Sequence, residues 1–339
     1  MKITLYSAQP YDERFFEEAR HHDFIDEGFE LVYQKVALEA RTTALAEGSD
    51  AVCVFVNDVL DAQVLESLAT MGVRAVVLRC AGFNNIDLDT AERLGFFVAR
   101  VPAYSPEAVA EHALALAMTL NRHTHRAFNR VREGNFALDG LLGITLHGKT
   151  AGIVGTGRIG LATARIFKGL GCRVLGSDPW PAEDFAAIGE VVDVDTLLAQ
   201  SDIVSLHCPL TDKTHHLIDE AALSHMKAGA MLINTSRGAL IDTQAVIEAL
   251  KSRQLGALAI DVYEQESGLF FHDHSSEIIA DDVFSRLMTF PNVLVTGHQG
   301  FFTIEALREI AQVTFNNLVC FSRGAHCGNA LMQACDTQR

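Results

Sequence analysis

The chain has 339 residues, more than one hydrophobic core of ordinary size accommodates, so two domains are expected. Its formal net charge of −16 at pH 7 would repel nucleic-acid phosphates, and no basic stripe is concentrated anywhere, so we expect no nucleic-acid partner. The apolar run after Lys2 is too short for a signal peptide and no later run is long enough for a membrane span, which predicts a cytoplasmic protein with no membrane partner.

The spacing of cysteine and histidine indicates neither disulfides nor a metal site. An odd number of cysteines without a C-x-x-C pair favours reduced, mostly buried thiols, at Cys53, Cys80, Cys172, Cys208, Cys320, Cys327 and Cys335. Four histidine pairs have no third ligand at a recognisable spacing: His21/His22, His123/His125, His215/His216 and His272/His274. The sequence therefore predicts no metal.

The first hundred residues alternate short apolar runs with helical segments. Runs of strand length occupy residues 2–7, 29–34, 51–56, 75–80 and 96–101. Residues 61–72 have helical apolar spacing and end at a glycine. This alternation predicts an α/β domain with a mostly parallel sheet.

One long helix is predicted over residues 105–134, with Ser105 as N-cap, Pro106 in the first turn and Gly134 after the last. Its middle, residues 108–120, is apolar nearly all round, and such a helix must be covered on every face. We expect it to be buried between the domains or against a second subunit, so a homodimer or homotetramer is predicted.

A second alternation starts near residue 150. Strands are predicted at 150–155, 173–178, 203–208, 230–235, 257–261 and 293–297, followed by one helix over 303–322 and a polar tail. Because no further sheet remains to be built, this last helix is expected to return to the first domain. The chain is then a Rossmann-type domain, 102–298, inserted into a substrate domain formed by 1–101 and 299–339, with hinge crossings near 101 and 299.

A G-x-G-x-x-G sequence lies between a predicted strand and a predicted helix; its residues are Gly155, Thr156, Gly157, Arg158, Ile159 and Gly160. The glycines allow a tight turn, approach of the backbone to a pyrophosphate and close helix packing, while N–H groups at the helix start face the phosphate charge. Asp178, at the end of the next strand, is placed to accept from ribose hydroxyls and to repel a 2′-phosphate. This context predicts NAD as the cofactor.

Several longer motifs together resemble the D-isomer-specific 2-hydroxyacid dehydrogenases over nearly the whole chain. They are GTGRIG (155–160), SLHCPLT (205–211), NTSRGALID (234–242), DVYEQES (261–267) and TGHQGF (296–301). Three more, LRCAGFNNIDLD (78–89), VPAYSPEAVAEHA (101–113) and LFFHD (269–273), are similar to the bacterial fermentative D-lactate dehydrogenases of that family. The resemblance implies a flavodoxin-like substrate domain and an NADH-dependent oxidoreductase that reversibly reduces pyruvate to D-lactate.

The catalytic arginine, glutamate and histidine of that family fall on Arg237, Glu266 and His298. Reduction of a 2-keto acid needs a planar cation to hold the carboxylate and polarise the ketone, which suits Arg237. It also needs a proton donor, which suits His298 beside a carboxylate. Glu264 and Glu266 both follow the strand that ends at Asp261, and only the resemblance selects Glu266.

The resemblance also implies residues that bind the cofactor. His207, Cys208 and Pro209 are expected beside the adenosine, while Thr235 and Asp261 are expected near the nicotinamide ribose and carboxamide.

For the substrate, the resemblance implies that backbone N–H groups near Ala81 and Gly82 bind the carboxylate, with Arg79 as a helper. Tyr104 and Phe301 match positions that line a small pocket in lactate-type members, and ordinary aromatic packing is the alternative for both. Two other functions stay open: a dehydrogenase for a larger 2-keto acid, and a dinucleotide-sensing protein similar to the family's corepressors.

Overall fold

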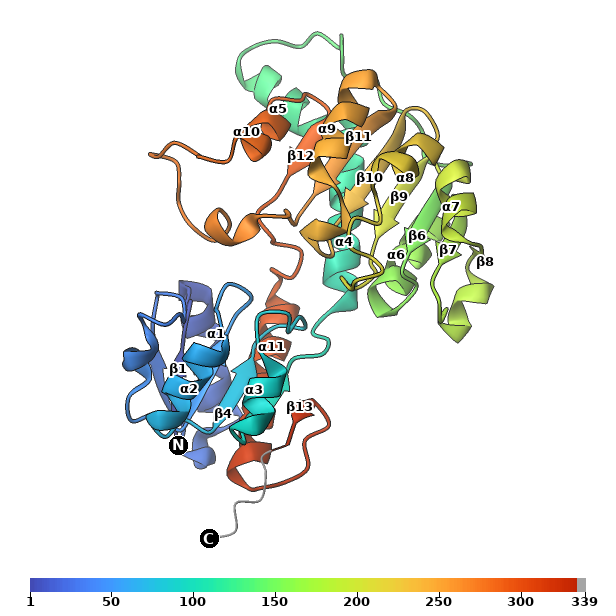
Figure 1. Cartoon of the computed structure of the whole chain (residues 1–339). Helices are drawn as coiled ribbons and strands as arrows, with labels where there is room; N and C mark the ends of the chain where they lie inside the picture. Colours follow the sequence, from blue (N-terminus) through green and yellow to red (C-terminus); the bar gives the residue numbers. More distant parts are fainter. Residues whose placement is uncertain (334–339) are drawn as a thin grey trace. The chain divides into compact units, whose positions relative to one another are not determined.

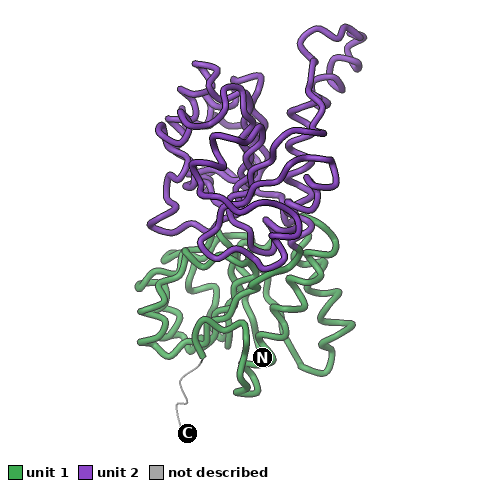
Figure 2. The backbone as a smooth tube through the Cα atoms, turned by 90° about the vertical axis from the view of Figure 1, so that its right-hand side faces the viewer, with its two compact units in different colours: residues 1–105, 302–339 green, residues 106–301 purple. Residues whose placement is uncertain are grey.

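The computed structural model describes residues 1–333 and divides into two compact units, each built around its own sheet. Unit 1 comprises residues 1–105 and the described part of 302–339, and unit 2 comprises residues 106–301 (Figure 2). Their limits lie a few residues from the domain limits predicted from the sequence. Cys335 falls outside the described residues.

Unit 1 contains a sheet of six strands in the order β13-β5-β4-β3-β1-β2. Figure 1 labels β1, β4 and β13 of this sheet. Its strands are β1 Lys2–Leu5, β2 Glu30–Tyr33, β3 Ala51–Val54, β4 Ala75–Leu78, β5 Phe97–Arg100 and β13 Ala330–Met332. The first five pair in parallel, and their order 2-1-3-4-5 is that of flavodoxin-like folds.

Helices cover the sheet of unit 1: α1 Pro10–His22, α2 Ala62–Thr70, α3 Leu88–Arg93 and α11 Ile304–Ser322, with 3₁₀ turns at Ile25–Glu27 and Thr43–Ala46. Helix α11 contacts α1, β4 and β5, and its Phe315 packs among Phe16, Phe24 and Phe29 in the core. A helix from the far end of the sequence therefore completes the core of the first domain, as predicted.

Unit 2 contains a parallel sheet of seven strands in the order β12-β11-β10-β9-β6-β7-β8. Its strands are β6 Thr150–Val154, β7 Arg173–Ser177, β8 Glu190–Val191, β9 Ile203–Leu206, β10 Ala230–Asn234, β11 Leu255–Ile260 and β12 Val293–Val295. Counted from β6, this is the Rossmann order 3-2-1-4-5-6 with one further strand. The switch in strand order, where such sheets bind dinucleotides, lies between β6 and β9.

The helices of unit 2 are α4 Pro106–Arg122, α5 Thr124–Arg132, α6 Arg158–Gly169, α7 Val194–Gln200, α8 Glu220–His225, α9 Thr243–Ser252 and α10 Asp282–Met288. Its 3₁₀ turns are η3 Glu183–Ala187, η4 Gly238–Leu240 and η5 Glu266–Gly268. Aspartate side chains cap α7, α8, α9 and α10 by accepting from backbone N–H groups in the first turn. The two sheets and their order confirm the predicted two-domain α/β fold.

The single helix predicted over residues 105–134 is two helices, α4 and α5. His123 takes a left-handed backbone conformation, with φ of 51°, and this ends α4. One face of α4 packs against α6, β10, β11 and β12 of unit 2, while Glu111 and Ala115 are exposed. Unit 2 therefore covers one face of α4, and burial of the rest between the domains or against a second subunit stays a prediction.

The sequence patterns did not predict two short strands, β8 and β13. β8 has two residues and β13 three, too few for a periodic signal, and β13 adds an antiparallel strand beside β5 where only a polar tail was expected.

The six cysteines among residues 1–333 are free thiols, five of them buried. No helix within that range combines the length and apolar character that crossing a bilayer requires.

Candidate active site

The glycine turn after β6 has the shape that a dinucleotide pyrophosphate requires. Gly155 has φ of +88°, and a Cβ there would lie 2.5 Å from the backbone nitrogen of Cys208. A Cβ on Gly157 would meet nothing within 4 Å, so the space over this residue is open. Helix α6 begins at Arg158 without a side-chain cap, which leaves its first N–H groups available to an anion.

Asp178 follows β7 and is fixed by two backbone groups. Its Oδ2 accepts from the N–H of Thr156 at 2.7 Å, and its Oδ1 accepts from the N–H of Trp180 at 2.8 Å. A carboxylate has further lone pairs beyond these two bonds. Asp178 is thus held next to the glycine turn with capacity to accept from ribose hydroxyls, which fits NAD.

The segment after β9 holds the residues expected beside adenosine. The Nε2 of His207 lies 2.9 Å from Oγ of Ser205, and burial lowers the pKa of His207 to about 4, so the ring is neutral at pH 7. Burial also raises the pKa of the Cys208 thiol to about 11, which keeps it protonated. Pro209 follows directly and is exposed. The side chains of His207, Cys208 and Pro209 are therefore uncharged at pH 7.

Thr235, at the end of β10, presents a hydroxyl that no protein group within residues 1–333 satisfies. The residue is buried, and a buried hydroxyl without a partner is costly. A ligand hydroxyl at the carboxyl end of this sheet would remove that cost. Thr235 therefore fits a position beside the nicotinamide ribose.

Arg237 lies two residues beyond Thr235, at the start of η4. Its Nη1 donates to the carbonyl of Ser236 at 2.8 Å, and its own carbonyl accepts from Nδ2 of Asn234 at 2.8 Å. The ion pairs found in the described part of the chain do not include Arg237. The half-buried guanidinium is therefore able to bind a substrate carboxylate.

Glu266 and His298 are directly bonded. The Nδ1 of His298 lies 2.9 Å from Oε1 of Glu266, and Oε2 of Glu266 accepts from the N–H of Tyr263 at 3.0 Å. An ionised carboxylate only accepts, so Nδ1 carries a proton in this pair and Nε2 is the atom left for the substrate. The two side chains are only 17% and 21% exposed, which limits how strongly water screens the pair.

Asp261 holds the turn that carries His298. Its backbone carbonyl accepts from the N–H of His298 at 2.7 Å, and its carboxylate accepts from the N–H groups of Gln299 and Gly300 at 2.8 and 2.7 Å. These bonds stabilise a left-handed backbone at His298, φ 54°, which a non-glycine residue rarely adopts. The rings of Phe271 and Phe301 lie near His298, with centroids 5.7 and 6.4 Å away.

Asp261 also has side-chain partners that sequence reasoning missed. Nε2 of His112, from α4, lies 3.2 Å from Oδ1 of Asp261, and Oγ1 of Thr296 donates to the same oxygen. Burial alone would raise the pKa of Asp261, but these two hydrogen bonds and the charge of His112 lower it below its ordinary value. His112 lies within a quoted motif, yet nothing local indicated its partner.

Glu264, the alternative carboxylate, has different partners. Its Oε1 lies 2.7 Å from Nε2 of His216, and its Oε2 accepts from Oγ1 of Thr243 at 3.0 Å. The sequence could not distinguish the two glutamates, but their hydrogen-bond partners do. Glu266 is the one that bonds to His298.

The predicted substrate residues of unit 1 follow β4 and β5. Arg79 is 2% exposed, and its guanidinium donates to Asp12 and to the carbonyl of Ser7 while stacking over Phe55. Its Nη1 is buried and has no hydrogen-bond partner among the described residues, so its expected role as a helper to the substrate stays a prediction.

The backbone carbonyls of Ala81 and Gly82 accept hydrogen bonds from side chains of unit 1. Nη1 of Arg100 donates to the carbonyl of Ala81 at 2.6 Å, and Sγ of Cys80 donates to that of Gly82 at 3.3 Å. Their N–H groups make no backbone bond among the described residues. Tyr104 is half-buried in the segment between β5 and α4.

Comparison with known proteins places this chain in a family. Residues 114–300 match the model of the NAD binding domain of D-isomer specific 2-hydroxyacid dehydrogenases. The chain is 60% identical over 333 residues to a D-lactate dehydrogenase of Curvularia clavata, covering 98% of this chain and 96% of that one. It is 52% identical over 333 residues to the D-lactate dehydrogenase of Escherichia coli, covering 98% and 100%.

The structure agrees with the sequence comparison. The apo-structure of D-lactate dehydrogenase from Escherichia coli superimposes with a TM-score of 0.89 at 50% identity, covering 98% of this chain and 100% of that one. The glycine turn, Asp178 and the unsatisfied hydroxyl of Thr235 fit the NAD that the matched domain binds. The chain therefore belongs to the family of D-isomer specific 2-hydroxyacid dehydrogenases, which are NAD-binding oxidoreductases.

Proposed function

We propose that this protein is an NAD-dependent D-lactate dehydrogenase that reversibly reduces pyruvate to D-lactate. The observation that carries the proposal is the 2.9 Å contact between Nδ1 of His298 and Oε1 of Glu266 in a member of this family. The names of the relatives from Curvularia clavata and Escherichia coli support pyruvate and D-lactate as the substrate pair.

His298 is proposed as the proton donor. Glu266 accepts from Nδ1 and stabilises the charged imidazolium, so the proton on Nε2 can pass to the ketone oxygen as pyruvate becomes D-lactate. Asp261 fixes the backbone of the 296–300 turn, which limits the positions that the imidazole can take. In the reverse direction, neutral His298 accepts the proton of the D-lactate hydroxyl.

Arg237 is proposed to bind the substrate carboxylate and to polarise the ketone. A guanidinium offers two parallel N–H donors, which orient the substrate carboxylate. Its positive charge stabilises the ketone oxygen more strongly as that oxygen becomes negative during the reaction. Bound NADH supplies the hydride. The residues of unit 1 proposed to assist are the backbone N–H groups of Ala81 and Gly82, and Tyr104.

Asp178 is proposed to select NAD over NADP, because its fixed negative charge repels a 2′-phosphate. Phe301, buried and beside His298, is proposed to restrict the size of the substrate. No comparable structural observation favours a larger 2-keto acid as the substrate or a role similar to that of the family's corepressors.

A parallel assay tests the activity directly. NADH oxidation is measured with pyruvate, glyoxylate, oxaloacetate and phenylpyruvate, and the chirality of the product is determined for pyruvate. We expect pyruvate to give the highest kcat/KM and the product to be D-lactate. A higher kcat/KM with phenylpyruvate would favour the larger substrate, and no oxidation with any keto acid would remove the enzyme proposal.

We also propose a cytoplasmic homodimer or homotetramer. Helix α5 and the loop after it (Figure 1) carry large apolar side chains that unit 2 leaves exposed: Phe128, Val131, Phe136, Leu138, Leu142 and Ile144. Phe136 is 74% exposed and Leu142 is 92% exposed, which is unusual for a stretch with so many apolar residues. A second copy of the chain would bury these side chains.

A further inference from the structure

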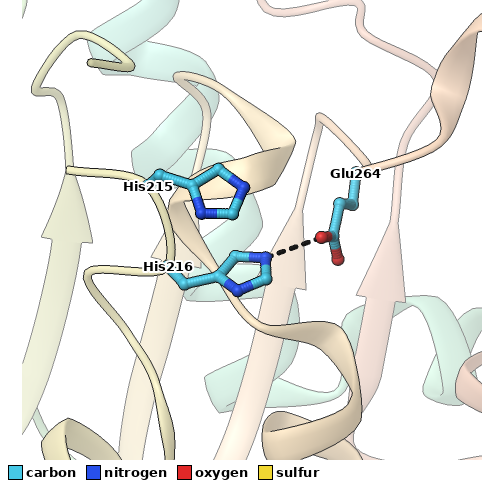
Figure 3. Close-up of side chains that lie close together, drawn as sticks. All are labelled: His215, His216 and Glu264. Atoms are coloured by element: carbon cyan, nitrogen blue, oxygen red, sulfur yellow. Dashed lines mark hydrogen bonds and ion pairs between the residues drawn. The ribbon is translucent and has the colours of Figure 1, made fainter. Parts of the chain in front are cut away.

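Three potential metal ligands meet at a place remote in sequence from the glycine turn. His215 and His216 lie in the loop between β9 and α8, and Glu264 follows β11 (Figure 3). Their ligand atoms all lie within 4.8 Å of one another. Figure 3 shows the two imidazoles one above the other, with the Glu264 carboxylate facing His216. This triad, His215, His216 and Glu264, has no part in the proposed reaction.

The backbone holds the two histidines in this arrangement. The N–H of His215 donates to the carbonyl of Thr211 at 2.9 Å, and that of His216 donates to the carbonyl of Ala239 at 2.8 Å. His216 has φ of 51°, so neighbouring side chains that an extended strand would direct apart lie together here. The rings stack with centroids 4.0 Å apart.

Hydrogen bonds and close packing also fix the position of Glu264. Oγ1 of Thr243 donates to Oε2 at 3.0 Å, which leaves Oε1 for Nε2 of His216 at 2.7 Å. A Cβ on Gly238 would overlap the backbone of Tyr263 and Glu264, so the chain packs tightly at this point. Hydrogen bonds of this kind to a ligating carboxylate fix its orientation and increase metal affinity.

Two imidazole nitrogens and one carboxylate oxygen form the donor set that Zn²⁺ accepts in sites with three protein ligands, with water in the fourth position. Metal–donor distances of about 2.0–2.2 Å place tetrahedral donors about 3.4 Å apart. The wider separations in the triad, up to 4.8 Å, must therefore shorten, while the 2.7 Å contact between His216 and Glu264 must lengthen. His215 is exposed, and His216 and Glu264 are half-buried but reachable from solvent. A cation would replace the direct contact between His216 and Glu264.

We infer that the triad His215, His216 and Glu264 binds one divalent cation of the Zn²⁺ class. The bound ion would link the loop at 209–217 to the end of β11, and it would therefore stabilise unit 2 rather than take part in hydride transfer. The sequence predicted no metal because the third ligand lies 48 residues from His216, which no local spacing indicates.

Zinc binding to the purified, metal-free protein tests the inference. Binding of Zn²⁺ is measured by isothermal titration calorimetry in the wild type and in His215→Ala, Glu264→Gln and His272→Ala. The exposed His215 can be replaced without disturbing the core, and Glu264→Gln keeps the side-chain shape. His272, exposed and near His274 with ring centroids 6.0 Å apart, provides a matched control from another histidine pair.

We expect one equivalent of Zn²⁺ to bind the wild type and His272→Ala, with affinity at least about tenfold weaker in His215→Ala and Glu264→Gln. Thermal unfolding should show a Zn²⁺-dependent increase in Tm that the same two variants lose. Far-UV circular dichroism and NADH binding establish that the variants are folded. Equal affinity in all four proteins, or no binding to the wild type, would overturn the inference and leave a simple hydrogen-bonded histidine–glutamate pair.

Discussion

Asp261 holds His298 through both its backbone and its side chain. The Asp261 carbonyl accepts from the His298 N–H at 2.7 Å, while the carboxylate accepts from the next two N–H groups, those of Gln299 and Gly300. A strained left-handed conformation at the proposed proton donor is thus maintained by an aspartate 37 residues earlier, at the end of β11.

Asp261→Asn should destabilise the turn at 296–300. An amide offers one acceptor oxygen in place of two, and its NH₂ group would face backbone donors, so we expect a loss of about 1–3 kcal/mol in the free energy of unfolding. The rate of pyruvate reduction should fall as well, because His298 is less well positioned. Chemical denaturation and steady-state kinetics measure both effects, and the exposed Asp212→Asn provides the control.

This stabilisation should depend on pH. The pKa of Asp261 is lowered in the folded protein, so its contribution is fully present above the pKa of the unfolded chain and is lost as the pH falls through the folded-state pKa. The difference in Tm between wild type and Asp261→Asn should therefore be largest near neutral pH and shrink below about pH 4. A constant difference down to pH 3 would mean that the charge of Asp261 is not what stabilises the turn.

Glu266→Gln should slow the reaction in both directions. The substitution keeps the shape but removes the carboxylate oxygen that accepts from Nδ1 of His298, so the imidazole is less well oriented toward the substrate and kcat should fall. Initial rates of pyruvate reduction and D-lactate oxidation measure this loss. Glu264→Gln is the matched control, and if it alone lowered kcat, the assignment of the carboxylate would be wrong.

Arg237→Lys should remove most activity although the charge is retained. A single ammonium cannot replace two parallel N–H bonds to one carboxylate, and the loss of about 3 kcal/mol corresponds to a decrease on the order of 10²-fold in kcat/KM. The exposed Arg253→Lys should have normal kinetics. Near-normal kcat/KM in Arg237→Lys would place Arg237 outside the substrate site.

Asp178→Ala should weaken the preference for NADH over NADPH, because the variant lacks both the ribose acceptor and the charge that opposes a 2′-phosphate. The kcat/KM ratio for the two cofactors should fall on the order of tenfold. Asp184→Ala, an exposed aspartate of the same unit, should keep the wild-type ratio. An unchanged ratio in Asp178→Ala would assign cofactor selection to another residue.

Leu142→Glu should weaken self-association. The side chain is 92% exposed in the isolated chain, so the substitution costs the monomer little, whereas a charge buried in an interface would be strongly unfavourable. Light scattering coupled to size exclusion measures the mass across protein concentrations. Ile278→Glu, at a residue that is 95% exposed and outside this segment, is the control. Equal masses for Leu142→Glu and wild type would exclude this segment from the interface.

The sequence by itself determined the features that depend on neighbouring residues. The strand and helix alternation, the glycine turn at 155–160 and Asp178 after the next strand follow from local periodicity and backbone freedom. That alternation also predicted the mostly parallel pairing of the strands. The long motifs also identified the family, and the match over residues 114–300 confirms it.

Only the tertiary structure decided which side chains meet across the sheets. Glu264 and Glu266 have the same local context, yet one bonds to His216 and the other to His298. Arg79 is buried against Asp12, which lies 67 residues away, and no local pattern indicates such a pairing. These contacts depend on strand order and on the direction in which each loop leaves its strand, and both are set by packing of the whole domain rather than by the neighbouring residues.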